Sequence, residues 1–195
     1  MKKYFVMILS LALLLGIPAT PLLSCTGKTL YLGITDTPDE QLLAEVLSVL
    51  INERTGTTIK IKPYADTRTL YQAVQQGEVS ILIEDTDTAL TVLGKNEKDA
   101  RRAYDISKEE FRKKYSLVWL EPFGLFSLSG HNTMTYCGAL LTSETISNFP
   151  ALPRVINKLS GQLNQELYQR LMNSLHNGVQ VRTVAKDFLK SKKLI

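Results

Sequence analysis

The feature that most constrains the fold is a buried strand followed directly by a strongly capped helix, between residues 28 and 56. The run KTLYLGIT is continuously apolar in character, which is typical of a strand in a buried parallel sheet. Thr37 then stands where a helix cap is needed, Pro38 at the first helical position and Glu40 where it completes a capping box. Apolar residues recur on one helical face until Gly56 ends the pattern. This βα unit predicts an α/β fold.

The same alternation of strands and helices continues along the chain. We expect strands in TTIKIKPY, VSILIED and LVWLEPFG, with helices in DTRTLYQAVQQGE, TDTALTVLG and EKDARRAYDISKEEFRKKYS between them. After residue 141 the pattern becomes helical. Strands that alternate with helices predict a three-layer sandwich with a mainly parallel sheet. Residues 125–141 differ, because two strand-like runs flank the breaker cluster SGHN and predict a hairpin.

Two polar loops follow strands of the predicted sheet. One is Thr35–Thr37 and the other is Glu84–Thr88. In open α/β sheets, ligands bind beyond the carboxyl ends of the strands. Each residue taken alone is explained as a helix cap, but two such loops at one sheet edge favour a ligand site.

The first 24 residues are predicted to be an export signal. Lys2 and Lys3 precede an apolar run of about 14 residues, which is shorter than the ~20 that span a bilayer. The segment Leu22–Cys25 resembles a bacterial lipoprotein box, which predicts lipidation of Cys25, with ordinary signal cleavage as the alternative. We expect a periplasmic or cell-envelope protein, anchored to a membrane by lipid without spanning it.

The second cysteine, Cys137, has three interpretations. It is a small buried hydrophobe, a disulfide partner of Cys25, or a catalytic thiol. With His131 and His176 as the only histidines, a metal centre or a Cys–His pair is not expected, and no cofactor is predicted. The formal charge of +4 falls to +2 without the two lysines of the leader, so no nucleic-acid partner is expected.

Several segments together resemble a known family. LYLGITDTPDEQLLAEVLSVLINERTGTTIKIKPY, LYQAVQQGEVSILIEDTDTAL and YSLVWLEPFG are similar to the first lobe of the glycine betaine, choline and carnitine substrate-binding proteins of ABC importers. FPALPRVINKLSGQLNQE and VAKDFLKSKKLI resemble the segment with which that family closes. The resemblance implies a type II periplasmic-binding-protein-like fold, no catalytic activity and an ABC importer permease as partner.

The resemblance also indicates a missing part. In family members, the chain crosses to a second lobe after the PFG element and returns before the FPALP-like element. In this sequence only 25 residues, 125–149, lie between these two elements, whereas a domain needs at least ~50. We therefore expect one lobe over residues 25–195. The hairpin at 125–141 would replace the second lobe, with Ser129 to Thr133 joining the two crossing strands.

The family's pocket residues carry over only in part. Its Glu-Gln pair is matched by Glu40 and Gln41, while its Tyr-Thr-Gly-Thr loop reads Asp85 to Thr88, so that the aromatic cage residue is lost. The candidate ligand-binding residues are Thr35, Asp36, Thr37, Gln41, Asp85, Thr86, Asp87, Thr88 and Tyr136, the last expected on the returning strand. We expect a small cationic or zwitterionic ligand, held weakly unless a second chain completes the cleft. The alternative is an exported interaction or sensing module without solute transport.

One enzyme class shares a motif with this chain. ILIEDTDTAL resembles the D-x-D-x-T nucleophile loop of haloacid-dehalogenase-type phosphatases, in which two aspartates face one phosphate. Ala89 replaces the threonine here, and the acids after Gly124 are only Glu144, Glu166 and Asp187, so the late pair for Mg²⁺ has no counterpart. The sequence therefore favours a binding protein over an enzyme.

Overall fold

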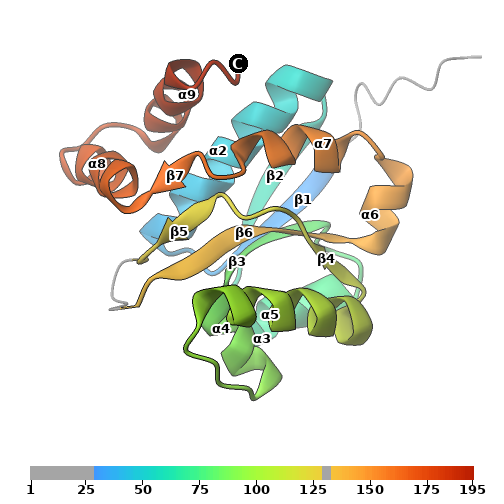
Figure 1. The fold of residues 1–195 in the computed structure, drawn as a ribbon. Coiled ribbons are helices and arrows are strands. Elements are labelled where there is room, and N and C mark those ends of the chain that lie inside the picture. Colours follow the sequence, from blue (N-terminus) through green and yellow to red (C-terminus); the bar gives the residue numbers. More distant parts are fainter. Residues whose placement is uncertain (1–28, 129–132) are drawn as a thin grey trace, which may run out of the picture.

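A computed structural model describes residues 29–128 and 133–195. It has a central sheet with helices on both faces, in three layers (Figure 1). The predicted leader, the lipidation site Cys25 and most of the predicted turn at Ser129 to Thr133 lie outside the described residues. None of the helices in the described ranges is both long and apolar enough to cross a membrane.

The elements follow the predicted alternation in their first half and become mainly helical in their second. In chain order they are β1 (Thr29–Ile34), α2 (Pro38–Thr55), β2 (Thr58–Pro63), α3 (Thr67–Gln75), β3 (Ile81–Asp85), α4 (Thr86–Leu93), α5 (Ala100–Tyr115), β4 (Leu117–Trp119), β5 (Gly124–Phe126), β6 (Thr135–Thr142), α6 (Ser143–Asn148), α7 (Leu152–Ile156), η1 (Asn157–Leu159), β7 (Leu163–Asn164), α8 (Gln165–His176) and α9 (Val181–Ser191).

The strand order is β2-β1-β3-β6-β5-β7, with β4 also pairing with β6. β1 is parallel to β2 and β3, and β5 is parallel to β7. The three pairings of β6, with β3, β4 and β5, are antiparallel. The α/β class is confirmed. The sheet is mixed because β6 returns directly beside β5 without a crossover helix, and a direct return can only be antiparallel.

The helix starts are set locally, as the sequence predicts. Thr37 accepts the backbone N–H of Glu40 at 3.2 Å, and Pro38 is the first residue of α2. Gly56 ends α2 with a φ of 68°, a left-handed conformation that glycine adopts without steric cost. These signals place the loop before α2 at the carboxyl end of β1.

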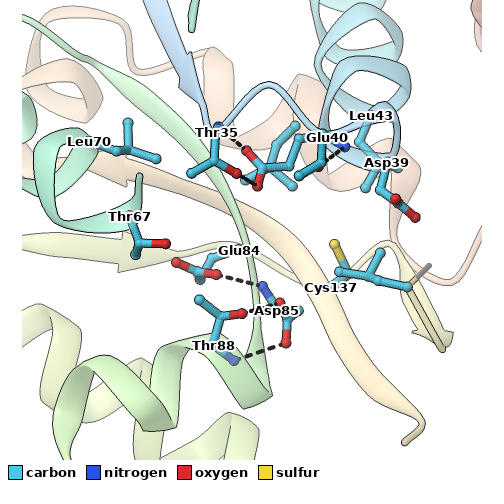
Figure 2. A pocket seen from close by; sticks show the side chains of 13 residues that line it. Thr35, Asp39, Glu40, Leu43, Thr67, Leu70, Glu84, Asp85, Thr88 and Cys137 are labelled. Carbon is cyan, nitrogen blue, oxygen red and sulfur yellow. Dashed lines mark hydrogen bonds between the residues drawn. The ribbon is translucent and has the colours of Figure 1, made fainter. Parts of the chain in front are cut away.

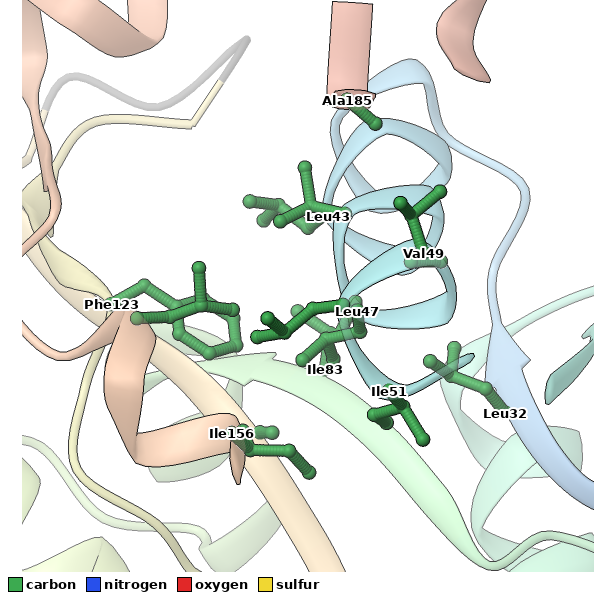
Figure 3. Close-up of a cluster of buried hydrophobic side chains, with 14 of the residues drawn as sticks. Leu32, Leu43, Leu47, Val49, Ile51, Ile83, Phe123, Ile156 and Ala185 are labelled. Carbon is green, nitrogen blue, oxygen red and sulfur yellow. The ribbon is translucent and has the colours of Figure 1, made fainter. Parts of the chain in front are cut away.

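The core consists of two apolar clusters, one on each face of the sheet. On one face, α2 packs with α7, α8 and α9, and Figure 3 shows Leu43, Leu47 and Ile51 of α2 pointing toward Phe123 and Ile156. On the other face, α3, α4 and α5 cover a cluster rich in aromatic rings. Its largest members are Tyr71, Tyr104, Phe111 and Trp119. The sheet is therefore buried on both faces.

The segment between β5 and β6 is part of this core. Gly124 pairs with Cys137, and Phe126 pairs with Thr135. Phe126 is fully buried and stacks on Tyr168 of α8, with ring centroids 4.5 Å apart. β5 also pairs with β7, so it is held on both sides.

The two edges of the sheet differ from its centre. β2 lies at one edge and reads TIKIKP, with Lys60 exposed, Lys62 half-buried and Pro63 at its end. β7, at the other edge, has two residues.

Candidate functional site

A cavity of about 190 Å³ lies at the carboxyl ends of β1 and β3, where these strands lead into α2 and α4 (Figure 2). Its polar wall consists of four acidic residues and four threonines, namely Asp39, Glu40, Glu84, Asp85, Thr35, Thr37, Thr67 and Thr88. Its apolar wall consists of Leu43, Leu70, Ile83, Leu128 and Cys137. This is the sheet edge that the sequence predicts for a ligand.

Glu84 is a buried acid of the cavity, with 7% of its surface exposed. Its carboxylate accepts the Tyr71 hydroxyl at 2.6 Å and the backbone N–H of Asp85 at 3.1 Å. Burial, followed by the charge of Asp85, raises the pKa of Glu84 well above its usual range, while the hydrogen bond from Tyr71 opposes the shift. The site thus holds a carboxyl group that favours its protonated form.

Glu40 approaches the cavity from the first turn of α2. Its carboxylate accepts the backbone N–H of Thr35 at 2.6 Å and the Thr35 hydroxyl at 2.5 Å. The predicted capping box is therefore half formed, because this carboxylate binds Thr35 rather than the backbone of Thr37. Burial raises the pKa of Glu40, and the charges of Asp85 and Asp39 act in the same direction.

Asp85 is the N-cap of α4. It accepts the backbone N–H groups of Asp87 at 2.9 Å and Thr88 at 3.1 Å, and the Thr88 hydroxyl at 2.7 Å. The hydroxyl of Thr135 on β6 donates to the same carboxylate at 3.3 Å. Capping alone accounts for this aspartate.

Four of the nine predicted ligand-binding residues line the cavity, namely Thr35, Thr37, Asp85 and Thr88. Asp36 and Gln41 lie outside the wall, where the Gln41 amide donates to Asp36 at 2.7 Å on the exposed side of the loop. Asp87 is also outside the wall, and it accepts the hydroxyl of Thr133.

The remaining two residues face away from the cavity. Thr86 is buried, and its hydroxyl lies 3.0 Å from that of Thr135, tying the start of α4 to β6. Tyr136 packs with the aromatic cluster on the opposite face of the sheet, 5.8 Å from Tyr104 between ring centroids. Its neighbour Cys137 faces the cavity instead, as a buried thiol whose pKa is raised well above its usual range by burial.

The candidate ligand-binding residues omitted four polar residues of the wall, namely Asp39, Glu40, Thr67 and Glu84. Asp39 is buried and accepts the hydroxyl of Tyr168 from α8. The sequence contains a signal for a buried acid at Glu84, because this residue directly follows the apolar run VSILI and precedes Asp85. Buried acids of this kind are uncommon unless they have a partner or a function.

The wall chemistry suits a positively charged ligand. Among the described residues, the wall has four carboxyl groups and four threonine hydroxyl groups, and it includes no Lys, Arg or His. Within residues 29–128 and 133–195, no group of three or more His, Cys, Asp or Glu side chains could hold a metal ion.

The buried carboxyl of Glu84 predicts a pH dependence of stability. Because its folded-state pKa is raised above 4.5, the folded state keeps the proton that the unfolded state has lost. The contribution to stability is full below about pH 4.5 and is lost as pH rises toward the folded-state pKa. Glu84→Gln removes this ionisation while keeping an acceptor for Tyr71. We expect urea unfolding to show a smaller loss of stability for the variant between about pH 5 and about pH 8.

Glu53→Gln, at an exposed position of α2, is the matched control and is expected to keep the wild-type pH dependence. Glu40 contributes in the same direction, so that the Glu84 variant loses only part of the slope. An unchanged slope in Glu84→Gln would contradict the role of this carboxyl.

A family model described as the substrate binding domain of ABC-type glycine betaine transport system matches residues 28–127, more than half of the 195 residues. Several solved structures share the fold at low sequence identity. A glycine betaine/carnitine/choline ABC transporter structure aligns with a TM-score of 0.77 at 16% identity, covering 87% of this chain and 99% of that chain. Apo YehZ from Escherichia coli gives 0.72 at 13% identity, with 86% and 99% covered. Lactococcal OpuAC, in a closed conformation with glycine betaine, gives 0.58 at 10% identity, with 85% and 96% covered.

Proposed function

Because this chain belongs to the family of substrate-binding domains of ABC-type glycine betaine transport systems, we propose that it is a non-enzymatic binding component of an ABC importer. The observation that carries the proposal is the acidic cavity at the carboxyl ends of β1 and β3. Its ligand is a small cation, and its partner is the importer's permease. The fold of the chain and the position of the cavity support this function together.

We also propose that the chain forms one lobe, over residues 25–195, and that the hairpin at 125–141 stands in place of a second lobe. The direct pairing of β5 with β6 supports this organisation. The other wall of the ligand site would then come from the permease or from a second chain. Met134, which is 47% exposed at the start of β6, is an apolar contact available to such a partner.

The proposed location is the periplasm or the cell envelope. Residues 1–24 would act as the export signal, and Cys25 would carry the lipid that anchors the protein. The intact mass of protein purified from membranes is expected to include a diacylglycerol group. A mature chain without lipid on Cys25 would contradict the anchor.

A second candidate function is an interaction or sensing module without solute transport. The observation that favours it is the set of hydrogen bonds that Asp85 accepts from the first turn of α4. A carboxylate that is engaged in capping contributes less to a ligand. In this case the cavity would be a remnant, and the exposed loop before α2 would be a surface for another protein.

Equilibrium binding separates the two functions. The panel is glycine betaine, choline, carnitine, proline betaine and ethylammonium, each at millimolar concentration, with thermal unfolding as the readout. A ligand at 100 times its dissociation constant adds about 2.7 kcal/mol to the stability of the folded state. We expect at least one cation to raise the melting temperature, and Thr67→Tyr, which fills the cavity, to abolish the shift.

Gln72→Tyr, on the exposed side of the same helix α3, is the matched control and is expected to keep the ligand-dependent shift. If no compound of the panel stabilises the wild-type protein, solute binding is excluded for this class of ligand and the interaction module is favoured.

A further inference from the structure

We propose that the cavity selects small ammonium ions that carry N–H groups and no carboxylate, such as alkylammonium ions, over quaternary and zwitterionic amines. This inference rests on the proposed function and specifies the ligand of the same cavity. It follows from which groups the wall contains and from which hydrogen-bond acceptors the chain leaves available.

The part of the wall formed by described residues contains no aromatic ring. A quaternary ammonium ion has no N–H group to donate, and proteins recognise it mainly through aromatic faces, each worth ~0.5–2 kcal/mol. Tyr71 donates its hydroxyl to Glu84, but its ring belongs to the aromatic cluster on the other face of the sheet. Among the described residues, the cavity thus offers a quaternary nitrogen no aromatic face.

Glu84 and Glu40 have hydrogen-bonding capacity that the chain does not use. An ionised carboxylate has about four acceptor sites. Glu84 accepts two hydrogen bonds from the chain, and Glu40 also accepts two. Asp85 accepts four, three of them on Oδ1. The remaining acceptors therefore lie on two different elements, β3 and α2, facing one cavity (Figure 2). An ammonium ion with N–H groups fits this arrangement.

Three of the four wall carboxylates lack an ion-pair partner in the described part of the chain, namely Glu40, Glu84 and Asp85. A carboxylate on the ligand would face these groups, and the described wall residues offer no lysine, arginine or histidine to receive it. This arrangement disfavours zwitterions such as glycine betaine and favours a ligand with positive charge alone.

The ionisation of the wall supports the same ligand class. Burial raises the pKa values of both Glu84 and Glu40, which favours their protonated forms in the absence of a cation. The groups that face Glu84 are Tyr71 from α3, Asp85 from β3, Glu40 from α2 and Cys137 from β6. None of them supplies a positive charge. A bound cation would displace the protons, and its affinity is therefore expected to rise with pH.

The test is a methylation series at constant charge. Ethylammonium and its mono-, di- and trimethylated forms are titrated into the full chain by calorimetry, with glycine betaine as the zwitterionic probe. We expect the affinity to fall at least tenfold from ethylammonium to ethyltrimethylammonium, and glycine betaine to bind at least tenfold more weakly than ethylammonium. Glu84→Gln and Glu40→Gln are each expected to weaken ethylammonium binding at least tenfold. Glu53→Gln, with the same charge change at an exposed site of α2, is expected to stay within twofold.

The outcomes distinguish this inference from the proposed function. If the quaternary ion or glycine betaine binds as tightly as ethylammonium, the inference is wrong and the proposed function stands. If none of the probes binds, both are wrong. An equal loss of ethylammonium affinity in Glu53→Gln and Glu84→Gln would show attraction by overall charge and would overturn the assignment to the cavity.

Discussion

Replacing Gly124 by alanine is expected to lower the free energy of unfolding by about 3 kcal/mol, at the upper end of overpacking effects. A Cβ atom at this position would lie 1.7 Å from the carbonyl oxygen of Leu163 and 2.7 Å from its carbonyl carbon. The obstacle is backbone, so no side-chain rotation relieves it. β5 would have to move away from β7 and stretch the hydrogen bond from the Leu163 N–H to the carbonyl of Phe123, now 3.0 Å long.

Urea unfolding of Gly124→Ala and Gly138→Ala measures this effect. Gly138 lies on the adjacent strand β6, and a Cβ there would meet its nearest atom, the Cα of Pro122, at 3.3 Å. A shift of a few tenths of an ångström accommodates this contact, so we expect a much smaller loss, below about 1.5 kcal/mol. Equal losses in the two variants would show that the close approach of β5 to β7 is not the cause.

Phe126→Ala is expected to cost about 3–5 kcal/mol, the range for removing a buried aromatic side chain. Phe126 is fully buried between the sheet and α8, and its ring is stacked on Tyr168. The hydroxyl of Tyr168 in turn donates to Asp39, a wall residue of the cavity. The loss of Phe126 therefore removes core packing and a support of the site.

Leu125→Ala is the control for this truncation, because Leu125 is the adjacent residue of β5 and is only half-buried. It is expected to cost less than half as much as Phe126→Ala. A loss below about 1 kcal/mol for Phe126→Ala would mean that the β5–β6 segment is loosely attached to the rest of the fold.

The parts of the fold that could be predicted are those with local causes. Thr37, Pro38 and Gly56 set the ends of α2 through contacts within a few residues, so their pattern is visible in the sequence. The mixed character of the sheet was not predictable in the same way. It depends on β6 lying between β3 and β5. The pairing of β6 with β3 joins segments that are about 50 residues apart in the sequence.

The location of the candidate site could be predicted from the sequence, but the full set of residues that line it could not. The loops after β1 and β3 meet as expected, because carboxyl ends of parallel strands share one edge of the sheet. Tyr136 could not be oriented, since a shift of one residue in strand register exchanges its side with that of Cys137. Glu84 could not be assigned to the wall from the sequence, because the direction of its side chain depends on the pleat of β3 and on the hydrogen bond from the Tyr71 hydroxyl.

The edges of the sheet bear on how this chain can meet another. An unpaired strand edge is a template for strand addition, by which partners bind and misfolded copies aggregate. Here β2 carries Lys60 and Lys62 and ends in Pro63, which has no N–H to donate, while β7 offers two residues. Extension of the sheet is disfavoured at these two margins. Assembly with a partner is therefore expected to use side-chain surfaces rather than β2 or β7, and the protein is expected to resist polymerisation through these two strands at high concentration.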